Sequence, residues 1–343
     1  KSQADRGTVV ALHSKTGAIL AMASYPEFDP NRYQDYSRAH HLNQAVTLGY
    51  EPGSTFKMIT IAAGLSEGLI SPDQEFFCEN GEYKIGINMI RDTSPHGLMT
   101  LQQVLKKSSN ICAAKIGMSM PPTRFHEYIM RFGFGRRSNS GIAAEATGRV
   151  ISPKKWQTID HANISFGQAI LVSPLQMVSA ANVFANEGEW VPPFIVEYAV
   201  DKNGNKLQEI KDVGGKVSHK FGLGVRSRVV EGSVAELVKK YLISVTQKGG
   251  TAQKAAILGY QVAGKTGTSQ IYDQQLGRYS QTRYIASFVG FAPASDPLVT
   301  VLVVVEQPRT SIYGGTIAAP IFKEIVQRTL LFKDVLPFPK DNS

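Results

Sequence analysis

A serine and a lysine three residues apart, Ser54 and Lys57, form the pattern Ser-x-x-Lys in this chain of 343 residues. The pattern opens a predicted helix over residues 54–67, because Pro52-Gly53 forces a turn before it. One helical turn separates the two side chains, so they share a face of the helix. A serine hydroxyl becomes a nucleophile when a base removes its proton, and burial or a second cation can lower the pKa of a lysine enough for that task. The pattern therefore predicts Ser54 as a nucleophile and Lys57 as its base.

A second polar motif, Ser108-Ser109-Asn110, lies between predicted helices at residues 101–107 and 111–118. Taken alone, it is typical of a polar connector that caps the second helix. Together with the first motif, it predicts that Ser108 relays a proton to a leaving amine. The same interpretation gives Asn110 the task of binding a peptide group of the substrate through its side-chain amide.

The third motif, Lys265-Thr266-Gly267-Thr268, lies in a β-rich stretch over residues 260–269. We expect this strand to border a cleft and to bring Lys265 close to Lys57 as the second cation. Gly267 leaves room for a substrate backbone to pair with the strand as an added strand would.

The same strand can also bind the charged groups of a substrate. The hydroxyls of Thr266 and Thr268 can hold a terminal carboxylate. The backbone N–H groups of Thr268 and Ser54 can form an oxyanion hole. The three motifs together therefore predict acyl transfer through a serine ester.

Each motif has a simpler interpretation when it is taken alone. Ser54 can be an ordinary helix cap, with Lys57 solvated at the surface. A second Lys-Thr-Gly, at residues 15–17, lies in a predicted hairpin turn, where glycine and polar residues are expected for the turn alone. The presence of three motifs in a fixed order favours chemistry at Ser54.

A nucleotide-binding loop is a competing interpretation of the third motif. Residues 259–266 (GYQVAGKT) match the pattern G-x-x-x-x-G-K-[ST], and residues 301–306 (VLVVVE) resemble a Walker B strand. Such a loop must follow a buried strand and open a helix. Residues 254–258 are short for that strand, and residues 267–278 lack an apolar helical face. The sequence therefore disfavours nucleotide binding.

The order of the predicted elements indicates an α+β fold. Two β-branched stretches within residues 7–24 predict a hairpin. Further strands are expected at residues 260–269, 284–292 and 298–306, followed by a closing helix at 316–331. Helices are predicted between these two groups of strands, at residues 54–67, 101–107, 111–118, 121–131, 173–188 and 233–248. We expect one antiparallel sheet from the hairpin and the late strands, covered by helices that also form a second lobe.

The net charge of +9 permits a nucleic acid, an anionic membrane or an anionic polymer as partner. The basic residues are scattered in pairs without interleaved aromatics, so the sequence predicts no nucleic-acid partner. No run of about 18 apolar residues occurs, which disfavours a membrane span within this chain. Because the chain starts at Lys1 without a methionine, we interpret it as part of a longer protein.

The sequence predicts neither a metal site nor a cofactor. It contains two cysteines, Cys78 and Cys112, without a Cys-x-x-Cys motif, and the histidines do not have the spacing of metal ligands. We expect the two cysteines to be unpaired, with Cys112 as a small core side chain. A disulfide is the alternative.

On these three motifs and their flanks, the chain resembles the transpeptidase domain of class B penicillin-binding proteins. Similar stretches include residues 7–30, 50–57 (YEPGSTFK), 90–92, 173–188 and 249–269, so the likeness covers residues 7–331. The first of the motif flanks, YEPGSTFK, is most similar to the division-specific subgroup.

The resemblance implies a single domain over residues 1–343 with a five-stranded antiparallel sheet between helices. Its sheet lobe would come from about residues 1–50 and 250–335, and its all-helical lobe from about 54–248. The implied activity is a peptidoglycan D,D-transpeptidase. Ser54 would be acylated with Lys57 as its base, and Ser108 and Asn110 would face Lys265, Thr266, Gly267 and Thr268 across the cleft.

The resemblance also implies partners and a location. The substrate would be the D-Ala-D-Ala end of a stem peptide, and β-lactams would acylate Ser54. A membrane glycosyltransferase and division proteins would be partners. The domain would act on the periplasmic side of the bacterial inner membrane, held by an N-terminal anchor and a pedestal domain outside this chain.

Three related activities use the same motifs and stay open at this point. A serine β-lactamase of one class needs a glutamate in the string E-x-x-L-N, which the sequence lacks. A D,D-carboxypeptidase transfers the acyl group to water and has nearly the same motifs. A β-lactam-sensing domain would be acylated at Ser54 without turning over peptides.

Overall fold

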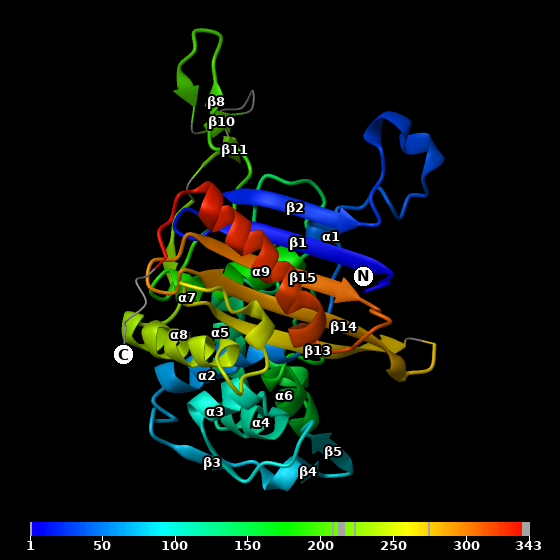
Figure 1. The fold of residues 1–343 in the computed structure, drawn as a ribbon, viewed down its shortest axis with the longest axis vertical. Helices are drawn as coiled ribbons and strands as arrows, with labels where there is room; N and C mark the ends of the chain where they lie inside the picture. Colours follow the sequence, from blue (N-terminus) through cyan, green and yellow to red (C-terminus); the bar gives the residue numbers. More distant parts are fainter. Residues whose placement is uncertain (1, 208, 212–216, 223, 274, 338–343) are drawn as a thin grey trace.

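The main sheet consists of five antiparallel strands in the order β13-β14-β15-β1-β2 (Figure 1). The structure is a computed structural model that describes residues 2–207, 209–211, 217–222, 224–273 and 275–337. The strands are β1 (Arg6–His13), β2 (Ile19–Tyr25), β13 (Ala263–Asp273), β14 (Arg278–Ala292) and β15 (Val299–Glu306). The expected α+β fold with a five-stranded antiparallel sheet is confirmed.

Strand β15 shows why the sheet lies between helices. Its sequence VTVLVVVE has no polar alternation, and its first seven residues are buried. Such a continuous apolar run is typical of a strand that is covered on both faces. Helix α9 (Gly314–Phe332) packs across one face of the sheet, and α7 (Pro174–Ala185) packs on the other (Figure 1).

Below the sheet, helix α2 (Lys57–Ser66) is the centre of a helical lobe (Figure 1). Its residues 57–64 are all buried, so the helix is enclosed on all sides and not amphipathic. Helices α3, α4, α5 and α8 pack around it. Their bounds are Leu101–Lys107, Asn110–Met118, Pro122–Arg131 and Gly232–Thr246, close to the predicted ranges.

Several short elements were not predicted. They include α1 (Gln44–Thr47), α6 (Thr158–Ser165) and the 3-10 turns η1 (Pro30–Asp35), η3 (Glu79–Gly81), η4 (Pro153–Lys155) and η5 (Gln253–Ala255). A further 3-10 turn, η2 (Gly53–Phe56), lies at the start of the helix predicted over residues 54–67. Short strand pairs are β3–β6 (Glu75–Phe77, Leu98–Thr100), β4–β5 (Glu82–Ile85, Asn88–Arg91), β12–β7 (Ser227–Arg228, Glu189–Trp190), β8–β9 (Ala199–Val200, Lys206–Leu207) and β10–β11 (Glu209–Lys211, Val217–Lys220). The β8–β11 region projects away from the sheet (Figure 1).

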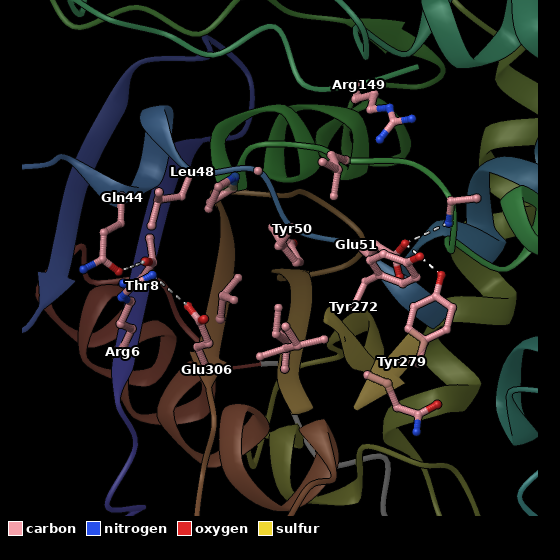
Figure 2. A pocket seen from close by; sticks show the side chains of 18 of the residues that line it. Arg6, Thr8, Gln44, Leu48, Tyr50, Glu51, Arg149, Tyr272, Tyr279 and Glu306 are labelled. Atoms are coloured by element: carbon pink, nitrogen blue, oxygen red, sulfur yellow. Dashed lines mark hydrogen bonds and ion pairs between the residues drawn. The ribbon is translucent and has the colours of Figure 1, made fainter. Parts of the chain in front are cut away.

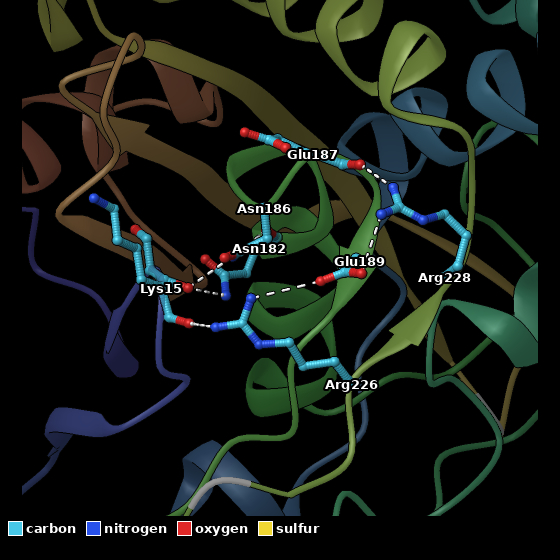
Figure 3. A network of polar contacts seen from close by, with 8 residues as sticks. Lys15, Asn182, Asn186, Glu187, Glu189, Arg226 and Arg228 are labelled. Carbon is cyan, nitrogen blue, oxygen red and sulfur yellow. Dashed lines mark hydrogen bonds and ion pairs between the residues drawn. The ribbon is translucent and has the colours of Figure 1, made fainter.

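Residues 15–17, the second Lys-Thr-Gly, form the turn between β1 and β2, as predicted. Gly17 has a φ of +78°, which favours glycine. Asn182 and Asn186 of the α7 region donate side-chain hydrogen bonds to the carbonyl oxygen of Ser14, at 2.9 and 2.7 Å. Figure 3 shows these contacts with the neighbouring network, in which Arg226 binds the backbone of this turn and pairs with a glutamate. The turn residues therefore have a structural function.

The structure also excludes a nucleotide-binding loop at residues 259–266. Lys265 and Thr266 lie inside strand β13, which continues to Asp273. A phosphate-binding loop would need a helix directly after these residues.

The prediction of unpaired cysteines was wrong, because Cys78 and Cys112 form a disulfide. Their Cα atoms lie 5.1 Å apart, although 34 positions separate them in the sequence. The segment from β3 to η3 lies against α4, and both side chains are fully buried there. This contact depends on tertiary packing, which the cysteine spacing does not reveal.

Candidate active site

Ser54 lies on a tight 3-10 turn, η2, which runs directly into α2. The turn begins at Gly53, whose φ of +55° favours glycine, and the N–H of Gly53 donates to the carbonyl oxygen of Gly167 at 3.0 Å. The hydroxyl of Thr55 donates to the carbonyl oxygen of Pro52 at 2.8 Å. The predicted α-helical start is therefore a 3-10 turn, and it holds the partly exposed Ser54 three positions before Lys57, the first residue of the buried helix.

Strand β13 passes directly beside this turn. A Cβ atom at Gly267 would lie 2.3 Å from Ser287 Oγ and 2.9 Å from the carbonyl oxygen of Pro52. Only a glycine allows this approach without displacing the turn. The sheet order leaves β13 at an edge, with β14 as its neighbour on one side. The strand with the third motif therefore borders the turn that carries Ser54.

Lys57 is fully buried and binds the second motif. Its ammonium donates to the backbone carbonyl oxygen of Ser108 at 2.5 Å and to Asn110 Oδ1 at 2.7 Å. Burial lowers the pKa of Lys57 to about 7, and the charge of Asp92 opposes part of this shift. A lysine with this pKa is partly neutral near neutral pH and can accept a proton.

The hydroxyl of Ser108 lies between two lysines. Lys265 donates to Ser108 Oγ at 2.8 Å, and Lys57 approaches the same oxygen at 3.3 Å. Burial, and then the charge of Lys57, lowers the pKa of Lys265 well below its ordinary value. The structure thus brings together the lysines of the first and third motifs through the serine of the second.

The backbone at Ser108 adopts a left-handed conformation, with a φ of +66°. This conformation is costly for a residue with a Cβ atom. It ends α3 and turns the carbonyl oxygen of Ser108 toward Lys57, while the next residue, Ser109, caps α4 by accepting from the N–H of Cys112 at 3.1 Å.

None of the three sequence motifs includes Asp92, yet its carboxylate holds the second motif. Oδ1 accepts from the backbone N–H groups of Asn110 and Ile111, and Oδ2 accepts from the hydroxyl of Ser109. A carboxylate at the first turn of a helix is favoured by the helix dipole. The sequence signal is the similarity of residues 90–92 to the family, which by itself assigns no task to Asp92.

The threonines of the third motif have protein partners. The hydroxyls of Thr266 and Thr251 lie 2.8 Å apart, and Thr268 Oγ1 accepts from the N–H of Gly314 at 3.4 Å. Thr266 is buried, whereas Thr268 is partly exposed. Both threonines lie on β13 close to Lys265, and these hydrogen bonds orient their hydroxyl groups.

Comparisons with known proteins agree with this geometry. Residues 7–327 match the family model of the penicillin-binding protein transpeptidase domain. The probable peptidoglycan D,D-transpeptidase PenA of Neisseria flavescens is 33% identical over 336 residues, which cover 98% of this chain and 78% of PenA. Stage V sporulation protein D of Bacillus subtilis is 33% identical over 334 residues, which cover 96% of this chain but only 50% of that protein.

Solved structures have the same fold. Penicillin-binding protein 3 of Mycobacterium tuberculosis in complex with aztreonam superposes with a TM-score of 0.88 at 30% identity, covering 98% of this chain and 75% of that one. Because the family model spans nearly the whole sequence, the chain belongs to the penicillin-binding protein transpeptidase family.

Proposed function

We propose that this chain is a serine D,D-transpeptidase that cross-links peptidoglycan stem peptides. The observation that carries the proposal is the position of Ser108 Oγ between Lys57 and Lys265, beside the turn of Ser54. Two basic groups with lowered pKa values next to a partly exposed serine suit nucleophilic acyl transfer. The printed name of PenA, a probable peptidoglycan D,D-transpeptidase, supports this choice of reaction.

In the acylation step, neutral Lys57 takes the hydroxyl proton of Ser54 as Ser54 Oγ attacks the carbonyl carbon of the penultimate D-Ala. The backbone N–H groups of Ser54 and Thr268 stabilise the resulting oxyanion. The C–N bond to the terminal D-Ala then breaks as Ser108 passes its hydroxyl proton to the leaving amine and receives from Lys57 the proton that came from Ser54. The products of this step are a Ser54 ester and free D-Ala.

The third motif binds the donor peptide. Its terminal carboxylate is held by Lys265, Thr266 and Thr268, since a cation and two hydroxyls are suitable partners for an anion. The donor backbone lies along the edge of β13, where Gly267 leaves room, and Asn110 binds a peptide group from the opposite wall.

An amine completes the reaction. Its nitrogen attacks the ester carbonyl carbon, the bond to Ser54 Oγ breaks, and the serine regains a proton as the new amide forms. A β-lactam enters as a mimic of the donor, and its ring opens to give an ester on Ser54 that hydrolyses slowly. The complex of the Mycobacterium tuberculosis relative with aztreonam supports β-lactam binding.

The proposed location is the cell envelope, on the periplasmic face of the bacterial inner membrane. Two observations support this location. The name of the relative PenA gives peptidoglycan as its substrate, and YEPGSTFK resembles the division-specific subgroup. The proposed partners are a membrane glycosyltransferase and division proteins. Among the helices of the described residues, none has both the length and the hydropathy that a membrane span requires.

The choice of acceptor tests the proposal. A synthetic stem pentapeptide ending in D-Ala-D-Ala would be incubated with the protein, with and without an amine acceptor. The products would be identified by mass spectrometry. A transpeptidase gives D-Ala and the amide product, and Ser54→Ala gives neither. Release of D-Ala without any amide product would instead indicate a D,D-carboxypeptidase.

A further inference from the structure

A pocket of about 510 Å³ lies next to the active site, between the start of β1 and the segments that lead to Ser54 (Figure 2). One wall, residues 48–51, runs into the turn that carries Ser54. A second wall, residues 270–272, continues β13 beyond Thr268. Because Glu51 and Ser54 are three positions apart in the sequence, their Cα atoms lie within about 11 Å of each other.

The end of the pocket near Tyr50 and Glu51 contains two buried polar atoms that have no hydrogen-bond partner in the described chain. Tyr50 is 7% exposed, and its hydroxyl has no hydrogen bond. Glu51 Oε1 accepts from the N–H of Ala169 and from the hydroxyl of Tyr279, each at 3.0 Å (Figure 2). Glu51 Oε2, however, is buried and has no partner. Buried polar atoms are normally hydrogen-bonded, so these two atoms need an explanation.

The surroundings select the chemistry of a ligand. Tyr272 and Tyr279 stand edge to face, with ring centroids 5.3 Å apart, beside the Glu51 carboxylate (Figure 2). A carboxylate oxygen next to aromatic rings suits an ammonium group, which donates to the oxygen and is attracted by the rings. Apolar residues such as Leu48 and Leu171 line the remainder of the pocket and suit an aliphatic chain.

We infer that this pocket binds the amine-bearing arm of the acceptor stem peptide before transfer, with its ammonium group against Glu51. The inference rests on the proposed function and adds the site of the second substrate. The donor would lie along the edge of β13, and the acceptor would reach Ser54 from the side of Glu51. Burial raises the pKa of Glu51 to about 7, against the effect of its two hydrogen bonds, and a bound cation would favour the charged carboxylate.

The test separates acylation from transfer. A thioester donor acylates Ser54, and stem tetrapeptides with lysine or meso-diaminopimelate at the third position serve as acceptors. Their half-saturating concentration for amide formation is measured against the competing hydrolysis. Glu51→Gln should raise that concentration about tenfold, because the charged hydrogen bond is lost. Acylation by a labelled penicillin should stay within about twofold of the wild type.

The matched control is Glu324→Gln. Glu324 lies on α9, outside the lining of the pocket, and pairs with Arg328 at 2.9 Å, so the acceptor concentration dependence should not change. If Glu51→Gln is acylated normally and its half-saturating acceptor concentration is unchanged, this inference is overturned and the proposed function still stands. Absence of penicillin labelling in the wild type would overturn the proposed function instead.

A binding measurement on the wild type covers the case in which Glu51→Gln fails to fold. The protein is first acylated with penicillin, and its melting temperature is followed with increasing acceptor peptide. A peptide with a free side-chain amine should raise the melting temperature, and its N-acetylated counterpart should not. Equal shifts with both peptides would contradict recognition of the ammonium group.

Discussion

The ammonium nitrogen of Lys265 lies 2.8 Å from the hydroxyl oxygen of Ser108. This hydrogen bond joins the edge strand of the sheet to the end of α3 in the helical lobe. Lys57 approaches the same oxygen from the helical side, at 3.3 Å. A single hydroxyl thus contacts two buried amines, and a proton can pass between them and the reacting groups through it.

The acylation rate should depend on the protonation of Lys57. Its folded-state pKa is lowered to about 7, so the neutral base is present above that pH and is lost below it. The second-order rate constant for acylation by penicillin should therefore reach a plateau above about pH 7. Below that pH it should fall about tenfold per pH unit. Stopped-flow measurements between pH 5 and 9 provide the profile, and a rate independent of pH below 7 would argue against Lys57 as the base.

Replacement of Asp92 tests whether the pKa of Lys57 sets the pH profile of the acylation rate. The charge of Asp92 raises the pKa of Lys57, so Asp92→Asn should move the midpoint of the profile to lower pH. The same substitution removes a charged cap from α4, and we expect a loss of about 1 kcal/mol in the free energy of unfolding. A midpoint that stays in place or moves upward would contradict the assigned coupling.

Two substitutions at Ser108 separate its hydroxyl from its backbone conformation. Ser108→Ala and Ser108→Gly both remove the hydroxyl, so both should slow acylation about a hundredfold. Because φ is +66°, the glycine variant should be about 1 kcal/mol more stable than the alanine variant in urea unfolding. Equal acylation by wild type and both variants would exclude the proton relay.

A methyl group at Gly267 should disturb the active site through contact. In Gly267→Ala, the new Cβ atom meets Ser287 Oγ at 2.3 Å and the carbonyl oxygen of Pro52 at 2.9 Å. We expect a loss of about 1–3 kcal/mol in stability and about a hundredfold in acylation, because the turn of Ser54 must shift. Gly7→Ala is the control, since its Cβ atom would lie no closer than 3.7 Å to its neighbours. Wild-type acylation in Gly267→Ala would show that the turn tolerates displacement.

The disulfide between Cys78 and Cys112 should stabilise the helical lobe. It closes a loop with a sequence separation of 34, for which chain entropy gives roughly 3–4 kcal/mol. The double variant Cys78→Ala/Cys112→Ala should lose a comparable amount in urea unfolding, although acylation at 25 °C should persist. Mass spectrometry after iodoacetamide treatment of the denatured, unreduced protein provides the direct check. Two alkylated cysteines would contradict the bond.

The sequence was sufficient for the features that depend on local pattern. The valine-rich run of β15, the hairpin around residues 15–17 and the helices bounded by proline and glycine were predicted close to their observed bounds. Local pattern also distinguished the Lys265 motif from a phosphate-binding loop, because no helical face follows it.

The features that were missed depend on tertiary contacts. Asp92 and α4 meet because β5 folds back onto that helix, and no spacing rule connects Asp92 with Asn110. The pairing of Cys78 with Cys112 has the same origin. The α-helical start predicted at Ser54 became a 3-10 turn because the backbone contacts of Gly53 with Gly167 fix its entry. Such contacts between distant segments leave no periodic signal in a single sequence.

The most direct test of the account is the acylation of Ser54 itself. Wild type, Ser54→Ala and the exposed control Ser71→Ala would each be incubated with a fluorescent penicillin and examined by gel and intact mass. The account predicts one stable adduct per molecule on wild type and Ser71→Ala, and none on Ser54→Ala. No adduct on the wild type, or equal labelling of Ser54→Ala, would contradict the assignment of Ser54 as the nucleophile.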